Sequence, residues 1–108
     1  MIRPLLATLL AAVMAVPTAG LADIVREDDE YQRARVAAGE RISRAVGCRD
    51  GAELTGGGYR MSGADTDAAF IVLANYPLAD GRWRVAVRNQ SDEAQPLTLW
   101  VYALCQTD

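Results

Sequence analysis

The 108-residue chain contains no histidine and no lysine, and these two absences exclude several kinds of chemistry. Without histidine, the chain can build neither a Ser-His-Asp or Cys-His nucleophilic site nor a zinc site with histidine ligands. All positive side-chain charge comes from arginine, and acidic residues outnumber basic ones by 14 to 11. A mildly acidic chain lacks the basic footprint that nucleic-acid binding requires, so we expect no nucleic-acid partner.

Cysteine is also scarce, because Cys48 and Cys105 are the only two. Their pairing is unambiguous if both are oxidised within one chain. The alternatives are two free thiols or a disulfide between two chains. An internal bridge would close a loop of roughly 58 residues and add about 4 kcal/mol of stability by loop entropy. Such a bridge would suit a domain with a small core.

The first 22 residues have the features of a helical export signal. Residues 5–16 form an apolar run, and Gly20 and Ala22 offer small side chains for cleavage before Asp23. The run is shorter than the about 20 apolar residues that span a bilayer. We therefore expect residues 1–22 to be a signal peptide. The rest would be exported to the periplasm or outside the cell, with no stable membrane span after cleavage.

The exported part is long enough for one small domain. Residues 27–30 are all acidic, and like charges in a block resist packing, so residues 23–30 are expected to be a flexible acidic N-terminus. Residues 31–108 are expected to form the folded domain. Within it, residues 31–48 fit either an amphipathic helix or two strands that turn at Gly39, and periodicity does not decide between them.

Strand patterns are clearest in the last third of the chain. In residues 82–89 the apolar Trp83, Val85 and Val87 alternate with polar or small residues, and residues 97–105 alternate on two largely apolar faces. Joined by the polar loop 90–96, these segments predict an antiparallel hairpin, with the second strand central in its sheet.

Two further segments of the domain have strand or bulge signals. The apolar run 70–73 predicts a buried strand that Pro77 ends. Three successive glycines, residues 56–58, predict a bulge or a close approach of two backbones.

The spacing of these motifs resembles that of small β-rich, disulfide-tied modules in bacterial secreted and surface proteins. The shared features are Cys48, Gly51, the three glycines 56–58, Tyr76-Pro77, the Trp-x-Val-x-Val-x-Asn segment 83–89 and the Val-Tyr-Ala-x-Cys segment 101–105. Arg49 departs from the proline that often follows the first cysteine. The resemblance implies strands for residues 31–48 and a Cys48–Cys105 bridge, and it implies no particular activity.

Three arginines, Arg82, Arg84 and Arg88, share the strand face opposite Trp83. With Arg60, which we expect beside them in space, their guanidinium groups could hold sulfate, phosphate or a carboxylate-bearing glycan. The alternative is a solvated face whose arginines pair with local acids. Trp100 and Tyr102 share a second strand face and form a candidate aromatic platform for a sugar, whereas Trp83 is expected in the core.

Carboxylates are the remaining candidates for catalysis or metal binding. Asp65-Thr66-Asp67 is too loose a pattern for a calcium site, which needs six to eight oxygen ligands. Asp50, Glu53 and Asp80 also lie in or beside turns, but so small a domain has little room for a two-carboxylate cleft. The three glycines lack the Lys-Ser/Thr that follows in a phosphate-binding loop. We expect no catalytic residues, no metal and no cofactor.

Together these features predict an all-β protein, a small antiparallel β-sandwich with one disulfide. The expected function is an exported, non-catalytic binding or surface-interaction module whose partner is an anionic glycan or another protein. The alternative is a small secreted inhibitor or effector that acts on another protein through the loop 90–96. A minimal carboxylate enzyme is the third hypothesis.

Overall fold

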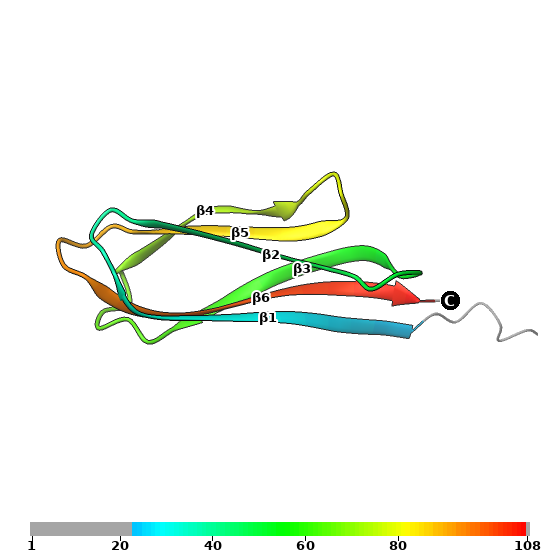
Figure 1. Ribbon diagram of the computed structural model, residues 1–108, viewed down its shortest axis with the longest axis horizontal. Helices are drawn as coiled ribbons and strands as arrows, with labels where there is room; N and C mark the ends of the chain where they lie inside the picture. The colour runs from blue at the N-terminus through cyan, green and yellow to red at the C-terminus, as the bar shows by residue number, and fades with distance from the viewer. Residues whose placement is uncertain (1–22, 108) are drawn as a thin grey trace, which may run out of the picture.

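The computed structural model describes residues 23–107, which fold into two packed antiparallel sheets of three strands each (Figure 1). One sheet has the order β1-β6-β3 and the other β2-β5-β4. The strands are β1 (Asp23–Val36), β2 (Arg41–Gly47), β3 (Glu53–Ser62), β4 (Phe70–Pro77), β5 (Arg82–Asn89) and β6 (Gln95–Thr107). The predicted β-sandwich is confirmed.

The expected signal peptide, residues 1–22, lies outside the described residues. From Asp23 to Thr107, no helix is long and apolar enough to cross a membrane.

Residues 23–30, expected to be flexible, instead form the first part of β1. They pair with β6 in an unbroken antiparallel register that begins at Asp23 and Thr107. The like charges of this segment are compensated, because three of its acids form ion pairs with arginines. The pairs are Arg26–Asp28 at 2.7 Å, Arg49–Glu27 at 3.0 Å and Arg44–Asp29 at 2.9 Å. The expectation was wrong because backbone pairing and these cations offset the repulsion that the sequence suggests.

Residues 31–48, which fitted a helix or two strands, form the second half of β1 and all of β2. The chain reverses at Gly39, whose φ of 82° lies in the left-handed region that glycine adopts without steric cost. The Gly39 N–H donates to the Asn89 carbonyl at 2.8 Å, which ties this turn to the end of β5. The strand interpretation is therefore correct.

β5 and β6 do not form the predicted hairpin. Each is the central strand of its own sheet, and the loop between them crosses from one layer to the other. Val85 and Val87 of β5 and Leu99 of β6 are all fully buried between the two layers. Both strands have an apolar face to bury, so packing face to face removes more apolar surface from water than pairing edge to edge. The prediction that β6 is central is confirmed.

The core contains seven buried aliphatic side chains contributed by both sheets. They are Val36, Ile42, Val85, Val87, Leu97, Leu99 and Val101. Trp83 packs against this cluster from β5, half-buried, and its indole N–H donates to Asn75 Oδ1 at 2.8 Å. Its interior position agrees with the expectation from strand alternation.

The Cys48–Cys105 disulfide is formed, with a Cα–Cα distance of 5.7 Å. Cys48 directly follows β2 and Cys105 lies in β6, so the bond joins the two sheets. Cys105 is almost completely buried. The disulfide therefore fixes the end of the sandwich opposite the turn at Gly39.

The three glycines allow close approach on both faces of β3, as their sequence predicted. The pairing of β3 with β6 shifts register between Leu54 and Gly56, which marks a bulge. A Cβ at Gly57 would overlap the Trp83 ring on the inner face. A Cβ at Gly58 would come within 2.7 Å of Tyr102 Cζ on the outer face. Glycine is required at both positions because an aromatic side chain occupies the space that a Cβ would take.

β4 is an edge strand rather than the buried strand expected from its apolar run. It pairs on one side only, with β5, and the register shifts between Val72 and Ala74. Ile71 and Leu73 are 41% and 44% exposed. An apolar run alone does not reveal whether a strand has one neighbour or two, so the sequence could not show this difference.

Candidate anion-binding face

Arginine side chains gather on the outer face of the β2-β5-β4 sheet. Arg84 and Arg88 of β5 alternate with Val85 and Val87, whose side chains fill the core, so the arginines point outward. The register places Arg41 of β2 directly beside Arg88. We call Arg41, Arg84 and Arg88 the basic face.

Arg84 is held in place by two hydroxyl groups from the neighbouring strands. Its Nε donates to Ser43 Oγ of β2 at 2.9 Å, and its Nη1 donates to Tyr76 Oη of β4 at 2.7 Å. Its guanidinium carbon lies 5.7 Å from the Tyr76 ring centroid. Because hydroxyls are neutral, they orient the guanidinium without cancelling its charge, and other N–H groups remain free to donate.

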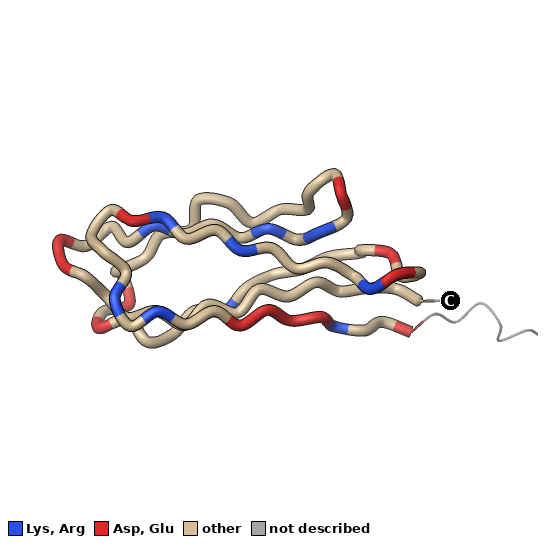
Figure 2. Tube along the Cα trace, in the orientation of Figure 1, with Lys and Arg blue, Asp and Glu red and all other residues tan. Residues whose placement is uncertain are grey.

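No residue of the basic face forms a salt bridge with a carboxylate in residues 23–107. Arg82 differs, because its Nε lies 2.9 Å from Asp80 Oδ2 in the preceding turn. Glu27, Asp28 and Asp29 of β1 pair with other arginines, and Figure 2 shows the acids of β1 on the opposite sheet from the arginines of β2 and β5. The predicted row of Arg82, Arg84 and Arg88 is therefore present, but Arg82 is locally neutralised.

Sequence reasoning missed Arg41, because nothing in the sequence showed that β2 lies beside β5. Arg60 was expected near the row of arginines, and this was wrong. It lies on β3, on the outer face of the other sheet, with its guanidinium 4.0 Å from the Trp100 ring centroid.

Trp100 and Tyr102 share the outer face of the β1-β6-β3 sheet, as strand alternation predicted. Arg60 covers the ring of Trp100, and Arg26 lies 4.3 Å from the ring centroid of Tyr102. Arg26 is also fixed by Asp28, whose hydrogen bond raises the pKa of the guanidinium. A sugar that stacked on either ring would first have to displace a guanidinium, so this platform is less accessible than its composition suggests.

One seam between the sheets is lined by polar groups rather than by apolar side chains. Arg44 falls on the apolar face of β2, where it donates two hydrogen bonds to Asp29 of β1, at 2.9 and 3.2 Å. These bonds raise the pKa of Arg44, and its guanidinium stacks 4.4 Å from the Tyr31 ring centroid. The seam has a structural role: its charges are paired with one another and stabilise the contact between the two sheets.

Glu40 forms a further ion pair of this seam near the Gly39 turn, and its carboxylate should make the stability of the fold depend on pH. Its carboxylate accepts hydrogen bonds from Arg33 and from the Ala37 N–H, and both lower its pKa below the ordinary 4.5. A group with a lowered pKa stabilises the fold above its ordinary pKa, and this effect is lost as the pH falls through the lowered value. We expect Glu40→Gln to melt earlier than the parent near neutral pH.

The difference between Glu40→Gln and the parent should shrink as the pH falls through the lowered pKa of Glu40, because protonation removes the charge of the parent's carboxylate. Thermal unfolding followed by circular dichroism from about pH 7 to about pH 3 measures it. A gap in melting temperature that stays constant over this range would show that the Glu40 charge contributes nothing.

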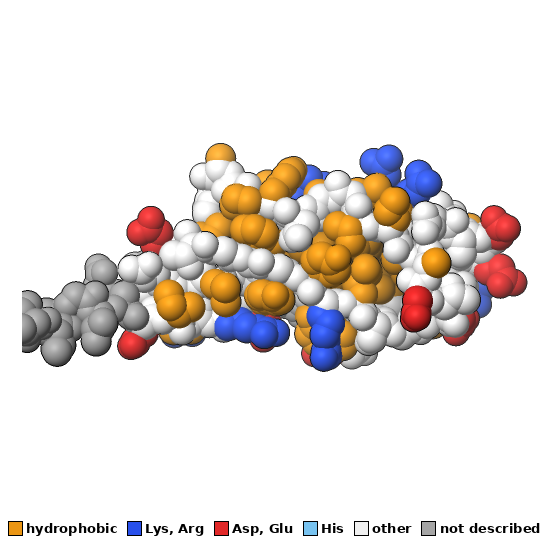
Figure 3. Space-filling model, turned by 180° about the vertical axis from the view of Figure 1, so that it is seen from behind, with side chains coloured by type: hydrophobic (Ala, Val, Ile, Leu, Met, Phe, Trp, Pro, Cys, Tyr) orange, Lys and Arg blue, Asp and Glu red, His pale blue; other side chains and the backbone are white. Residues whose placement is uncertain are grey.

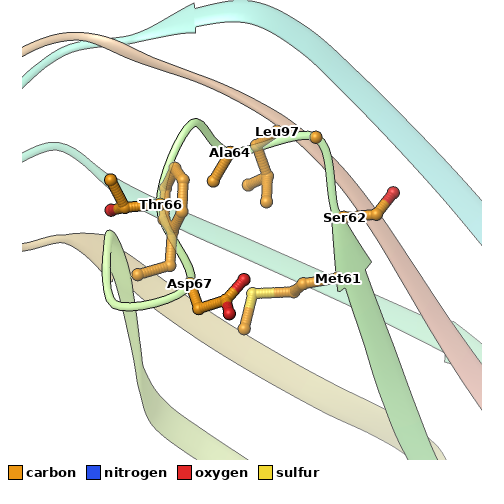
Figure 4. Close-up of a pocket in the computed structure, with 8 residues that line it drawn as sticks. Met61, Ser62, Ala64, Thr66, Asp67 and Leu97 are labelled. Atoms are coloured by element: carbon orange, nitrogen blue, oxygen red, sulfur yellow. The ribbon is translucent and has the colours of Figure 1, made fainter.

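A hollow at one end of the sandwich lies beside the β3–β4 connection (Figure 4). Met61, Phe70 and Leu97 provide apolar walls, and the Asp67 carboxylate lies near Met61. The backbone N–H of Asp65 donates a hydrogen bond to the buried Gln95 side chain at 2.9 Å, so Gln95 holds the loop in place. Between residues 23 and 107, no group of three or more His, Cys, Asp or Glu side chains could hold a metal ion.

Searches of protein-family models, of curated proteins and of solved structures each found no significant match to this chain.

Proposed function

We propose that this protein is an exported, non-catalytic binding module that holds an anionic glycan on its basic face. The observation that carries the proposal is the uncompensated charge of Arg41, Arg84 and Arg88 on one sheet surface of an otherwise acidic chain. Guanidinium groups bind carboxylate and sulfate with paired hydrogen bonds. Groups spread along a strand suit a polymer with repeated charges better than a single small ion.

The spacing of the basic face supports a repeated ligand. Arg84 and Arg88 are four residues apart on β5, which corresponds to roughly 13 Å along an extended strand. Arg41 lies beside Arg88 on the adjacent strand, so that end of the face offers two guanidinium groups. The hollow beside Arg84, lined in part by Leu73 and Tyr76, adds an apolar surface that a sugar ring can contact.

The disulfide supports the exported location, because such bonds persist in oxidising compartments. The sequence of residues 1–22 and the resemblance to bacterial secreted modules agree with export to the periplasm or beyond.

Retention on heparin resin tests the proposal. The triple variant Arg41→Gln, Arg84→Gln, Arg88→Gln should elute at clearly lower salt than the parent, because exposed charge interactions are screened by salt. The matched control is Arg26→Gln, Arg35→Gln, Arg60→Gln, which removes the same charge from outside the basic face. It should elute close to the parent.

Equal shifts for the two triple variants would show that net charge alone governs retention, and the proposal would then be abandoned. Circular dichroism of each variant checks that it folds. A dextran resin without charges should retain none of the three proteins.

A second candidate, a secreted inhibitor or effector, is favoured by the rigidity of the β5–β6 loop. Asn89, completely buried, donates from Nδ2 to the carbonyls of Val36 and Glu93 at 2.9 and 2.8 Å. Its Oδ1 accepts from the N–H and the hydroxyl of Ser91. The loop projects at the end of the sandwich (Figure 1) with its backbone braced from inside. A partner protein captured by the parent, and lost on changing exposed loop residues Asp92 and Glu93, would favour this candidate.

A further inference from the structure

The open edge of β4 carries no charge. From residue 68 to residue 79 the chain has no Asp, Glu, Lys or Arg, and Ile71, Leu73 and Tyr76 are each more than 40% exposed. Seen from behind, the molecule presents hydrophobic side chains across its middle, with arginines near the border of this area (Figure 3). An edge strand of this kind is a template for pairing with another strand, because its outward N–H and C=O groups lack partners.

The three other sheet edges are protected in ways that β4 is not. β1 carries the charged run 26–30, and β2 carries Arg41 and Arg44. β3 has three successive glycines, which offer no side chains for cross-strand contact, and carries the charged Arg60. Pairing β1 or β2 with a copy of itself would bring like charges together, which destabilises a strand pair. β4 is the edge whose self-pairing meets no such cost.

We propose that β4 pairs antiparallel with β4 of a second copy of this chain. The pair forms about a twofold axis at Leu73 and Ala74, so that Ile71 of one copy lies opposite Tyr76 of the other. Residues opposite each other in antiparallel strands share a face. In a regular strand, residues five apart such as Ile71 and Tyr76 would lie on opposite faces, and this pairing would fail.

The bulge in β4 removes that obstacle. Leu73 is the extra residue between Val72, opposite Val87, and Ala74, opposite Ala86. Beyond the bulge the alternation is reset, and Ile71 and Tyr76 pair with Arg88 and Arg84, which both point outward.

Ile71 and Tyr76 consequently share the outer face, and β4 can pair with itself from Ile71 to Tyr76. This self-complementarity, together with the absence of charge, points to a second copy rather than to an unrelated peptide.

The dimer would have one continuous sheet with the two β4 strands at its centre. The β5 strands of the two copies would lie three strand spacings apart, roughly 14 Å at the usual separation. Each copy would then present its basic face on the same surface, doubling the row of arginines. The dimer itself does not depend on anion binding, so either inference can fail without the other.

Sedimentation velocity tests the pairing, using protein purified after expression of the full 108-residue chain in a host with a general secretion pathway. We expect a dimer whose population rises with concentration. Leu73→Lys should weaken dimerisation by at least about tenfold, because it places two like charges at the twofold axis. The matched control is Ile24→Lys, which changes charge equally at a 58% exposed site on the other sheet. It should dimerise as the parent does.

Amide hydrogen exchange gives a second readout on the unmodified protein. The β4 amides that point away from β5 should become more protected as concentration rises, whereas those of β1 should not. A protein that is monomeric at every concentration, or that dimerises equally well with Leu73→Lys, would overturn the proposal. So would protection that rises on β1 instead of β4.

Discussion

Removing the disulfide with Cys48→Ala and Cys105→Ala is expected to lower the free energy of unfolding by about 2–5 kcal/mol. The bond closes 57 positions of sequence and joins strands of different sheets, so without it the unfolded chain gains much conformational freedom. Cys105 is almost completely buried, so its replacement also leaves a small cavity. For a domain this small, such a loss is a large share of the total stability. Urea unfolding followed by circular dichroism measures it.

Two controls distinguish the effect of losing the disulfide from the effect of replacing the cysteine side chains. The parent treated with reductant should unfold at nearly the same urea concentration as the double variant. The single variant Cys48→Ala, which keeps the buried Cys105, should unfold at a urea concentration close to that of both. If the oxidised parent and the double variant unfolded together, the disulfide would have no measurable effect on stability.

The fold class followed from sequence because β alternation and turn glycines are local signals. β6 shows the reason: alternate residues from Leu97 to Cys105 are buried, as their apolar character predicts. The connection between β5 and β6 was mispredicted because alternation shows which face of a strand is apolar and not which strand lies beside it. A polar loop can turn within a sheet or cross to another one, and tertiary packing decides between these.

The same limit applies to the binding face. Alternation placed Arg84 and Arg88 outward, because it needs only the neighbouring residues of one strand. Arg41 joined them only when strand pairing was known, and Arg60 proved to lie on the other sheet. The Arg44–Asp29 pair was equally hidden, since its members come from different sheets and are 15 residues apart in the sequence. Contacts between distant segments are set by topology, which one sequence reveals poorly.

Gly57 offers a sharp test of the packing inside the sandwich. Gly57→Ala would add a methyl group that overlaps the Trp83 ring and lies 2.7 Å from the Tyr102 carbonyl oxygen. Neither neighbour can move freely, since the Trp83 indole is hydrogen-bonded to Asn75 and the Tyr102 backbone pairs with both β1 and β3. Overpacking of this kind costs about 1–3 kcal/mol. Denaturant unfolding should show Gly57→Ala less stable than the parent by that amount.

Gly56→Ala is the matched control, because its new Cβ would meet only Leu104 Cδ1, at the ordinary contact distance of 3.7 Å. We expect that variant to stay within about 0.5 kcal/mol of the parent. Adding Trp83→Ala to Gly57→Ala removes the overlapped ring, so the double variant should be more stable than the sum of the single effects predicts. A coupling of about 0.5–3 kcal/mol is typical of residues in contact. If Gly56→Ala and Gly57→Ala were equally stable, or the two changes were strictly additive, Trp83 would not lie against β3 and the arrangement of the inner faces would have to be revised.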